Sequence, residues 1–224
     1  MGKKRSRVIL DETSLATTLW RLESARLDGI TRRSAAVSEA LAWIQSRIGQ
    51  EGAYAPMLAA PTPQDLSQGT RLTLMTGERA GYKTRHTLGE EAFRALHLWL
   101  GQSDEKLRTE LWPRSRSKKR PGYWCCPLCT LAFGRGLLAS RPDGWEIRVQ
   151  GIADELTRAD TAPDGTWWRF PFYYALLTLS DAPAEMTREV RKKVRGAAKK
   201  RMVDLGDDPD VARFREIGLR WAIG

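Results

Sequence analysis

The sequence has few of the residues that most often carry catalysis or bind metals. Its 224 residues include only two histidines and three cysteines. An odd number of cysteines does not make a fully paired disulfide framework of the kind found in small secreted proteins. No stretch approaches the roughly 18 consecutive apolar residues of a membrane span, and the N-terminal residues lack the apolar core of a signal peptide. We therefore expect a cytoplasmic protein without a membrane-spanning segment.

Several well-defined functional motifs are also missing. The sequence contains no Ser-His-Asp order, no Walker loop and no H-E-x-x-H pair. It also lacks zinc-finger and RRM motifs, which would indicate base-specific recognition of nucleic acid. These absences leave open whether the protein is an enzyme.

Positive charge is abundant and unevenly distributed. The formal net charge is +10, and basic residues concentrate at residues 3–7, in "RSRSKKR" at residues 114–120 and at residues 188–201. These three runs hold more positive charge than the whole chain, so the remainder is net acidic. Such runs are suited to binding phosphates, although solvated tails and helix faces have the same composition.

Apolar residues recur at helical spacing along most of the chain. Examples are Leu15, Leu19 and Leu22, and later Val190, Val194 and Ala197. This pattern predicts an all-α protein built from antiparallel helical hairpins, as an αα-repeat or a partial αα-barrel. The predicted organisation is an N-terminal helical half at residues 1–112, a basic linker at 113–121 and a C-terminal helical half at 122–224, which together could form one continuous domain.

Capping residues predict where several helices begin. Asp11 or Thr13 is expected to cap the first helix, and Thr87 with Glu90 reads as a capping box. Pro127 and Pro171 are suited to helix starts, and "DDPD" at residues 207–210 is expected to open the last helix.

One stretch resembles a repeat from a known superfamily. In "DGTWWRFPFYYALLTLSD", Asp164, Gly165 and Trp167 match a turn, while Tyr174 and "ALLTL" match the helix that follows it. The stretch resembles the αα-hairpin repeats of prenyltransferases and squalene cyclases. The resemblance implies an αα-hairpin architecture and an aromatic pocket for an apolar, isoprenoid-like ligand. Candidate pocket residues are Trp124, Trp167, Trp168, Phe172 and Tyr173. No catalytic residue is carried over, because "DLGDDPD" lacks the D-x-D-D spacing of the cyclases.

The basic runs give the leading hypothesis, which is binding of nucleic acid or another acidic partner. Lysine and arginine would contact phosphates, and neighbouring aromatic residues would stack on bases. The candidate polyanion-binding residues are Arg114, Arg116, Lys118, Lys119, Arg120, Arg188, Lys192, Arg195 and Lys199.

The cysteines form the cluster "CCPLC" and suggest three interpretations. Cys126 at a helix N-terminus is suited to thiol redox chemistry, because the helix dipole favours a thiolate. Cys126 and Cys129 could instead contribute two ligands to zinc, with Cys125 awkwardly adjacent. His86 and His97 are the available histidines, but on one helix they would lie about 16 Å apart, so one site is not expected to use both. The third interpretation is that the small sulfur side chains simply pack against a neighbouring helix.

A second dense stretch brings acidic and basic groups together at residues 75–96. Glu78, His86 and Glu90 are candidate catalytic residues there, and Cys126 is a fourth candidate. The alternative is structural, with Glu90, Arg94 and His97 forming a salt-bridged stripe on a helix surface.

Overall fold

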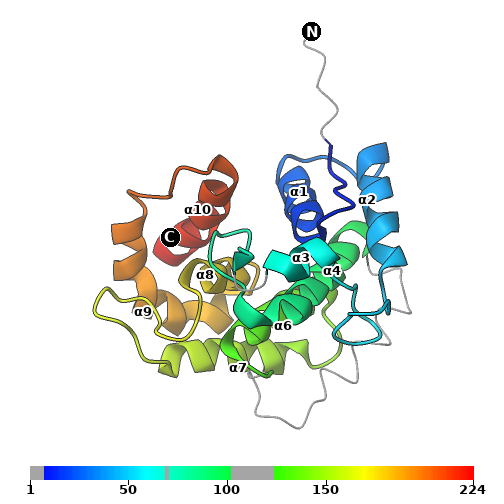
Figure 1. The fold of residues 1–224 in the computed structure, drawn as a ribbon. Coiled ribbons are helices and arrows are strands. Elements are labelled where there is room, and N and C mark those ends of the chain that lie inside the picture. Colours follow the sequence, from blue (N-terminus) through cyan, green and yellow to red (C-terminus); the bar gives the residue numbers. More distant parts are fainter. Residues whose placement is uncertain (1–7, 69–70, 102–123) are drawn as a thin grey trace.

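The computed structural model describes residues 8–68, 71–101 and 124–224 (Figure 1). These described ranges contain nine α-helices, one short 3₁₀-helix and no β-strand, which confirms the prediction of an all-α protein. The helices are α1 (Leu15–Leu27), α2 (Ala35–Ser46), α3 (Pro63–Gln68), α4 (Thr84–Leu100), α6 (Pro127–Ser140), α7 (Trp145–Arg158), α8 (Phe172–Ser180), α9 (Ala184–Arg201) and α10 (Pro209–Ile223), and the 3₁₀-helix η2 spans Gly81–Lys83. None of these described helices is both long and apolar enough to pass through a membrane.

One core joins the two ends of the chain. α4 packs along α6, α10 packs against α8 and α9, and α7 bridges α6 and α9 (Figure 1). The largest cluster of buried apolar residues contains Leu22 from α1, Phe93 from α4 and Tyr174 from α8. The predicted linker at residues 113–121 lies outside the described residues. A repeated-hairpin arrangement stays a prediction.

The cap of the first helix lies one residue after Thr13 and three residues after Asp11, the two expected capping residues. The cap is Ser14, whose hydroxyl accepts a hydrogen bond from the Thr17 N–H at 3.1 Å, so the prediction of Asp11 or Thr13 was wrong. Ser14 also donates to the buried carboxylate of Asp65, which accepts a further bond from the Leu15 N–H at 2.9 Å. An acidic side chain from α3 therefore stabilises the positive end of the α1 dipole.

The predicted capping box on the third long helix is also wrong. α4 begins at Thr84, so Thr87 and Glu90 lie inside the helix and both are fully buried. The T-x-x-E pattern is the same in a cap and in a helix interior, and the preceding 3₁₀ turn already supplies the start of α4.

The polar stripe on α4 faces the protein interior. Glu90, Arg94 and His97 each expose less than 5% of their surface, which contradicts the predicted surface stripe. The interior position is possible because other helices supply charged partners, described below, and buried charges require such partners.

Other predicted starts are confirmed. Pro127 is the first residue of α6, α8 begins at Phe172 directly after Pro171, and Asp208 caps α10 by accepting hydrogen bonds from two backbone N–H groups. Proline and aspartate give clear signals because each satisfies a geometric need of a first helical turn.

Candidate functional site

Helix α9 separates its apolar and basic residues onto different faces. Val190, Val194 and Ala197 are buried, as the spacing predicted, and the helix packs on α7 and α10. Arg188, Lys192 and Arg195 are exposed. Because the apolar stripe fixes the orientation of the helix, the cations are held on its outer face.

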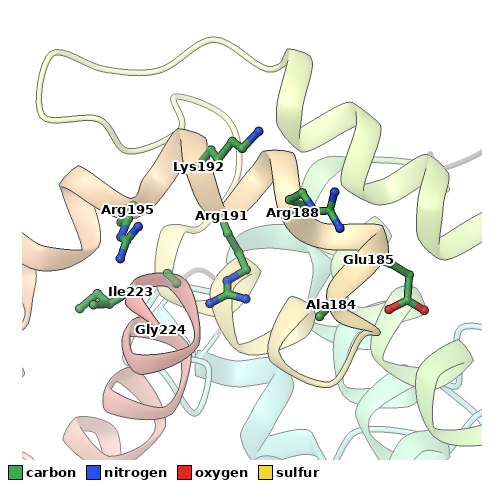
Figure 2. A pocket seen from close by; sticks show the side chains of 9 residues that line it. Ala184, Glu185, Arg188, Arg191, Lys192, Arg195, Ile223 and Gly224 are labelled. Carbon is green, nitrogen blue, oxygen red and sulfur yellow. The ribbon is translucent and has the colours of Figure 1, made fainter.

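A basic groove lies between this outer face and the end of α10. We define it by the residues that line it, which include three arginines and a lysine (Figure 2). Its volume is about 420 Å³. The lining residues are Ala184, Glu185, Arg188, Arg191, Lys192, Arg195, Ala222, Ile223 and Gly224.

The cations of the basic groove are only partly neutralised. Within the described residues, Arg188 and Arg195 form no ion pair, while Lys192 pairs with Glu189 at 2.8 Å between two exposed side chains. The Arg191 guanidinium lies 5.8 Å from the centre of the Trp221 ring, which orients it without cancelling its charge. The groove therefore concentrates positive charge that an anion can neutralise.

The other predicted polyanion-binding residues are distributed differently. Lys199 is exposed about one turn beyond Arg195 on α9 and does not line the basic groove. The candidates Arg114, Arg116, Lys118, Lys119 and Arg120 lie outside the described residues. The groove adds Arg191, which the sequence argument missed although its spacing of three from Arg188 places the two on neighbouring positions of one helix face.

The three cysteines surround the start of α6. Cys126 is its N-cap, and its sulfur accepts a hydrogen bond from the Cys129 N–H at 3.3 Å. Cys125 is exposed, Cys126 is half-buried and Cys129 is fully buried in the first turn. Pro127 fixes the backbone of the first helical residue and favours the extended backbone that Cys126 adopts before it.

His86 meets this cluster from the first turn of α4. Its Nδ1 lies 3.5 Å from Cys125 Sγ, and one ligand atom from each of His86, Cys125 and Cys129 lies within 4.8 Å of the others. The expectation that one site would not use both histidines is consistent with this geometry, because His97 instead packs on Phe93. The first turn of α4 brings His86 to Cys125, which is 39 residues away in the sequence.

Aromatic and acidic groups hold the His86 ring in place. Tyr54 stacks on the ring with 4.0 Å between the ring centres, and the Trp124 indole N–H donates to Nε2 at 2.7 Å. Glu90 Oε1 lies 3.2 Å from the same nitrogen. Of the four predicted catalytic candidates, His86 and Glu90 therefore contact each other, while Cys126 follows Cys125, the cysteine that His86 contacts.

The environment separates the acidities of the three thiols. Hydrogen bonds from the Cys129 thiol and backbone N–H outweigh burial and lower the pKa of Cys126 to about 5. The hydrogen bond to Cys126, together with burial, raises the pKa of Cys129 far above its ordinary range. Burial raises the pKa of Cys125. A single negative charge near neutral pH is therefore held mainly on Cys126.

Glu78, the fourth catalytic candidate, is engaged at the start of α8. Its carboxylate oxygens accept hydrogen bonds from the backbone N–H groups of Tyr173 at 3.1 Å and Tyr174 at 2.7 Å. Burial outweighs these bonds and raises the pKa of Glu78. Its observed contacts are those of a carboxylate that stabilises a helix N-terminus.

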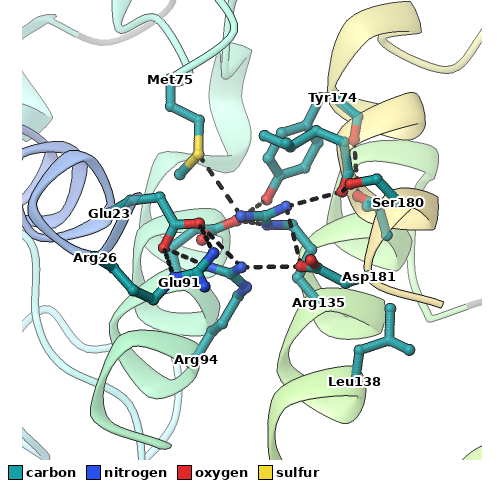
Figure 3. A network of polar contacts seen from close by, with 12 residues as sticks. Glu23, Arg26, Met75, Glu91, Arg94, Arg135, Leu138, Tyr174, Ser180 and Asp181 are labelled. Carbon is teal, nitrogen blue, oxygen red and sulfur yellow. Dashed lines mark hydrogen bonds and ion pairs between the residues drawn. The ribbon is translucent and has the colours of Figure 1, made fainter. Parts of the chain in front are cut away.

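A network of paired charges, buried except for the exposed Asp181, occupies the space between α1, α4, α6 and α8 (Figure 3). Arg94 contacts Glu23 and Asp181, both at 2.9 Å, and Arg135 contacts Glu91 at 2.7 Å. The Tyr174 hydroxyl donates to Glu91, and burial together with this carboxylate raises the pKa of Tyr174. Because the charges are paired, the network can link four helices within the core.

The predicted pocket residues have varied positions. The Phe172 ring contacts the rings of both Trp167 and Tyr173, and Trp167 is fixed by donating its indole N–H to the Leu156 carbonyl at 2.9 Å. Trp168 is exposed, whereas Trp124 stacks on Phe133 beside the cysteines. The apolar-ligand pocket, like the resemblance to prenyltransferases and squalene cyclases that suggested it, stays a prediction.

Comparisons with known proteins give no relative for this chain. No protein-family model, no curated protein and no solved structure matches it. The function of the protein is therefore inferred from its own residues and their geometry.

Proposed function

We propose that the protein binds nucleic acid through the phosphate backbone, using the basic groove along α9. The observation that carries this proposal is the convergence of Arg188, Arg191, Lys192 and Arg195 on one groove. Arginine presents several N–H donors in a planar fork that matches two phosphate oxygens. A row of such side chains on one helix is suited to successive phosphates of a strand.

The groove favours binding without sequence preference. Its lining offers charged side chains and small apolar residues, and Glu185 is its one acidic member. Contacts to phosphates position a nucleic acid but do not identify its bases. We therefore expect similar affinities for strands of different sequence, and a strong dependence on salt concentration.

The test compares salt dependence between variants that carry the same net charge. Binding of fluorescently labelled DNA is measured by anisotropy at several salt concentrations. In the groove variant, Arg188→Gln with Arg195→Gln, the affinity should fall and the slope of log K against log salt should decrease by roughly 1–2. Both side chains are exposed and form no ion pair within the described part of the chain, so the variant is expected to fold.

The control variant is Arg33→Gln with Arg79→Gln. It removes the same charge from two exposed arginines that do not line the basic groove. We expect it to retain the affinity and salt slope of the parent to within about twofold, since general electrostatic attraction changes equally in both variants. Equal losses in the two double variants, or unchanged binding in the groove variant, would contradict the proposal.

A further inference from the structure

We propose that His86, Cys125 and Cys129 form a zinc site that joins the N-terminal ends of α4 and α6. This site is independent of the basic groove and does not rest on the proposed nucleic-acid binding. The ligand atoms would be Nδ1 of His86 and the sulfurs of the two cysteines. A thiolate and imidazole set is typical of zinc among the common divalent ions, whereas magnesium and calcium prefer oxygen.

The distances are close to those that zinc requires. With Zn–S of about 2.3 Å and Zn–N of about 2.0–2.1 Å, a tetrahedral site separates nitrogen and sulfur ligands by roughly 3.6 Å. Nδ1 of His86 and Sγ of Cys125 are already 3.5 Å apart. One ligand atom from each of His86, Cys125 and Cys129 lies within 4.8 Å of the other two, so a movement of about 1 Å brings them to the spacing of a tetrahedral site.

The surroundings of the three ligands favour metal binding. Glu90 Oε1 is 3.2 Å from Nε2 of His86, on the opposite side of the ring from Nδ1. A carboxylate in this position fixes the orientation of a ligating histidine and stabilises the tautomer with the proton on Nε2. The exposed Cys125 provides the path by which the ion enters.

Cys126 is assigned a different role. Its sulfur caps α6 through the Cys129 N–H and is not part of the group of ligand atoms within 4.8 Å. The fourth position on zinc is therefore assigned to water on the exposed side of Cys125. This assignment makes Cys126→Ser a matched control, because serine is also a good N-cap.

Zinc binding must rearrange protons at the site. While the Trp124 indole donates to Nε2 of His86, the proton of the neutral ring is on Nδ1, facing Cys125. When zinc binds Nδ1, the ring loses the proton on Nδ1 and takes up a proton on Nε2. The new Nε2–H group then donates a hydrogen bond to Glu90. The thiols of Cys125 and Cys129 each release one proton to solvent. Because Nε2 becomes a donor, the Trp124 indole must move away from it.

The decisive experiment measures zinc affinity on the reduced, chelator-treated full-length chain. Zinc is titrated in competition with a chromophoric chelator, and the folding of each variant is checked by circular dichroism. We expect one zinc per chain, and no binding of magnesium in the same assay. Cys125→Ser and His86→Gln should each weaken zinc binding by about 100-fold or more, since each removes a ligand. Glu90→Gln should weaken it by about 10–100-fold.

Because Cys125 is exposed, Cys125→Ser is expected to fold even if a substitution at the buried His86 or Glu90 prevents folding. Cys126→Ser should bind zinc within about threefold of the parent, and an equal loss in Cys126→Ser and Cys125→Ser would overturn the ligand assignment. Failure of the parent to bind one zinc, or unchanged affinity in Cys125→Ser, would overturn the site itself. Zinc should also change tryptophan emission in the parent but not in Trp124→Phe. An identical change in both proteins would contradict ligation through Nδ1.

Discussion

Arg135 on α6 donates through Nε to the carboxylate of Glu91 on α4 at 2.7 Å, and both side chains are buried. Arg135 is fully enclosed, and its remaining nitrogens contact the Leu177 carbonyl at 3.3 Å and the Met75 sulfur at 3.7 Å. The same Glu91 oxygen accepts the Tyr174 hydroxyl. The ion pair therefore fixes the packing of the two helices that also carry the cysteine cluster and His86.

The first prediction concerns the loss of one partner from this pair. Arg135→Met keeps much of the side-chain volume but leaves Glu91 without its guanidinium in the core. Breaking a buried pair in this way costs about 3–5 kcal/mol, because the remaining charge is uncompensated. The free energy of unfolding, measured in urea, should fall by that amount.

The double variant Arg135→Met with Glu91→Gln separates charge from packing. It removes both charges, and the glutamine oxygen still accepts the Tyr174 hydroxyl. Its stability should exceed that of Arg135→Met alone, since no unpaired charge is buried. If the single variant costs less than about 1 kcal/mol, or the double variant is the less stable of the two, the ion pair is not what holds α4 against α6.

The second prediction is an acid sensitivity that originates at Glu23. Burial by itself would raise the pKa of this carboxyl, but the ion pair with Arg94 and hydrogen bonds from Arg26 and Arg94 hold it far below its ordinary value of 4.5. A folded-state pKa below the unfolded one stabilises the protein fully above about pH 4.5. This stability is lost progressively as the pH falls toward the folded-state pKa.

Glu23→Gln tests the origin of that dependence. The amide keeps an acceptor for Arg94 but cannot titrate, so the variant should be less stable at neutral pH and should lose less stability between about pH 5 and pH 2. Urea unfolding across this range measures both effects. Parallel pH profiles for the two proteins would assign the acid sensitivity to other groups.

The helices were predictable because the residues that a helix buries recur in the sequence at the helical period. On α9, Val190, Val194 and Ala197 recur at the helical period, and packing on α7 and α10 buries that stripe. Helix starts marked by a residue with a unique geometric role, such as Pro127, were also predictable.

The α4 residues show where such reasoning fails. Glu90, Arg94 and His97 have the spacing of a surface stripe, yet they face the interior. What makes their burial tolerable is distant in the sequence, as Glu23 and Asp181 supply the charges that pair with Arg94. A periodic pattern specifies which residues share a face but not what that face packs against.

The two candidate sites also differ in how much of each could be predicted from the sequence. The basic groove depends mostly on residues of one helix, so its cations were found from their spacing, with only Arg191 missed. The contact between His86 and Cys125 joins the starts of two helices. The sequence between these residues does not indicate that the chain brings them together. The sequence therefore offered His86 and Cys129 as metal ligands, but it favoured Cys126 over Cys125 and did not show that His86 reaches the cysteines.

The third prediction compares two glycines in helix interiors. A Cβ at Gly218 of α10 would lie 3.0 Å from the Leu177 backbone nitrogen and 3.1 Å from the Leu176 carbonyl carbon, both in α8. Backbone atoms in a helix cannot move aside individually, so Gly218→Ala should push α10 from α8 and lower the free energy of unfolding by about 1–3 kcal/mol.

Gly196→Ala is the control for this effect. Gly196 lies inside α9, and a Cβ there has no heavy atom within 4 Å beyond the helix itself, among the described residues. Alanine is the better helix former, so this variant should be more stable than the parent by about 0.5–1 kcal/mol. Changes of the same sign in the two variants would show that close helix approach does not explain Gly218.

The fourth prediction concerns the reactivity of Cys126 in the metal-free protein. A pKa lowered to about 5 makes its sulfur a thiolate throughout the neutral range. Alkylation by iodoacetamide at Cys126, followed by peptide mass spectrometry, should therefore proceed at a nearly constant rate between about pH 6 and pH 8. A cysteine with an ordinary pKa would react about tenfold faster for each added pH unit in this range.

Cys129→Ala identifies the cause of that thiolate. The variant removes the thiol that hydrogen-bonds to Cys126 but keeps the backbone N–H at the same position, and the thiol bond is the larger contribution. The alkylation rate of Cys126 should then rise with pH across the neutral range, because less of the sulfur is ionised at pH 6. If the rate stays independent of pH in Cys129→Ala, the lowered pKa of Cys126 is caused by the backbone N–H and the α6 helix dipole, which the substitution leaves in place.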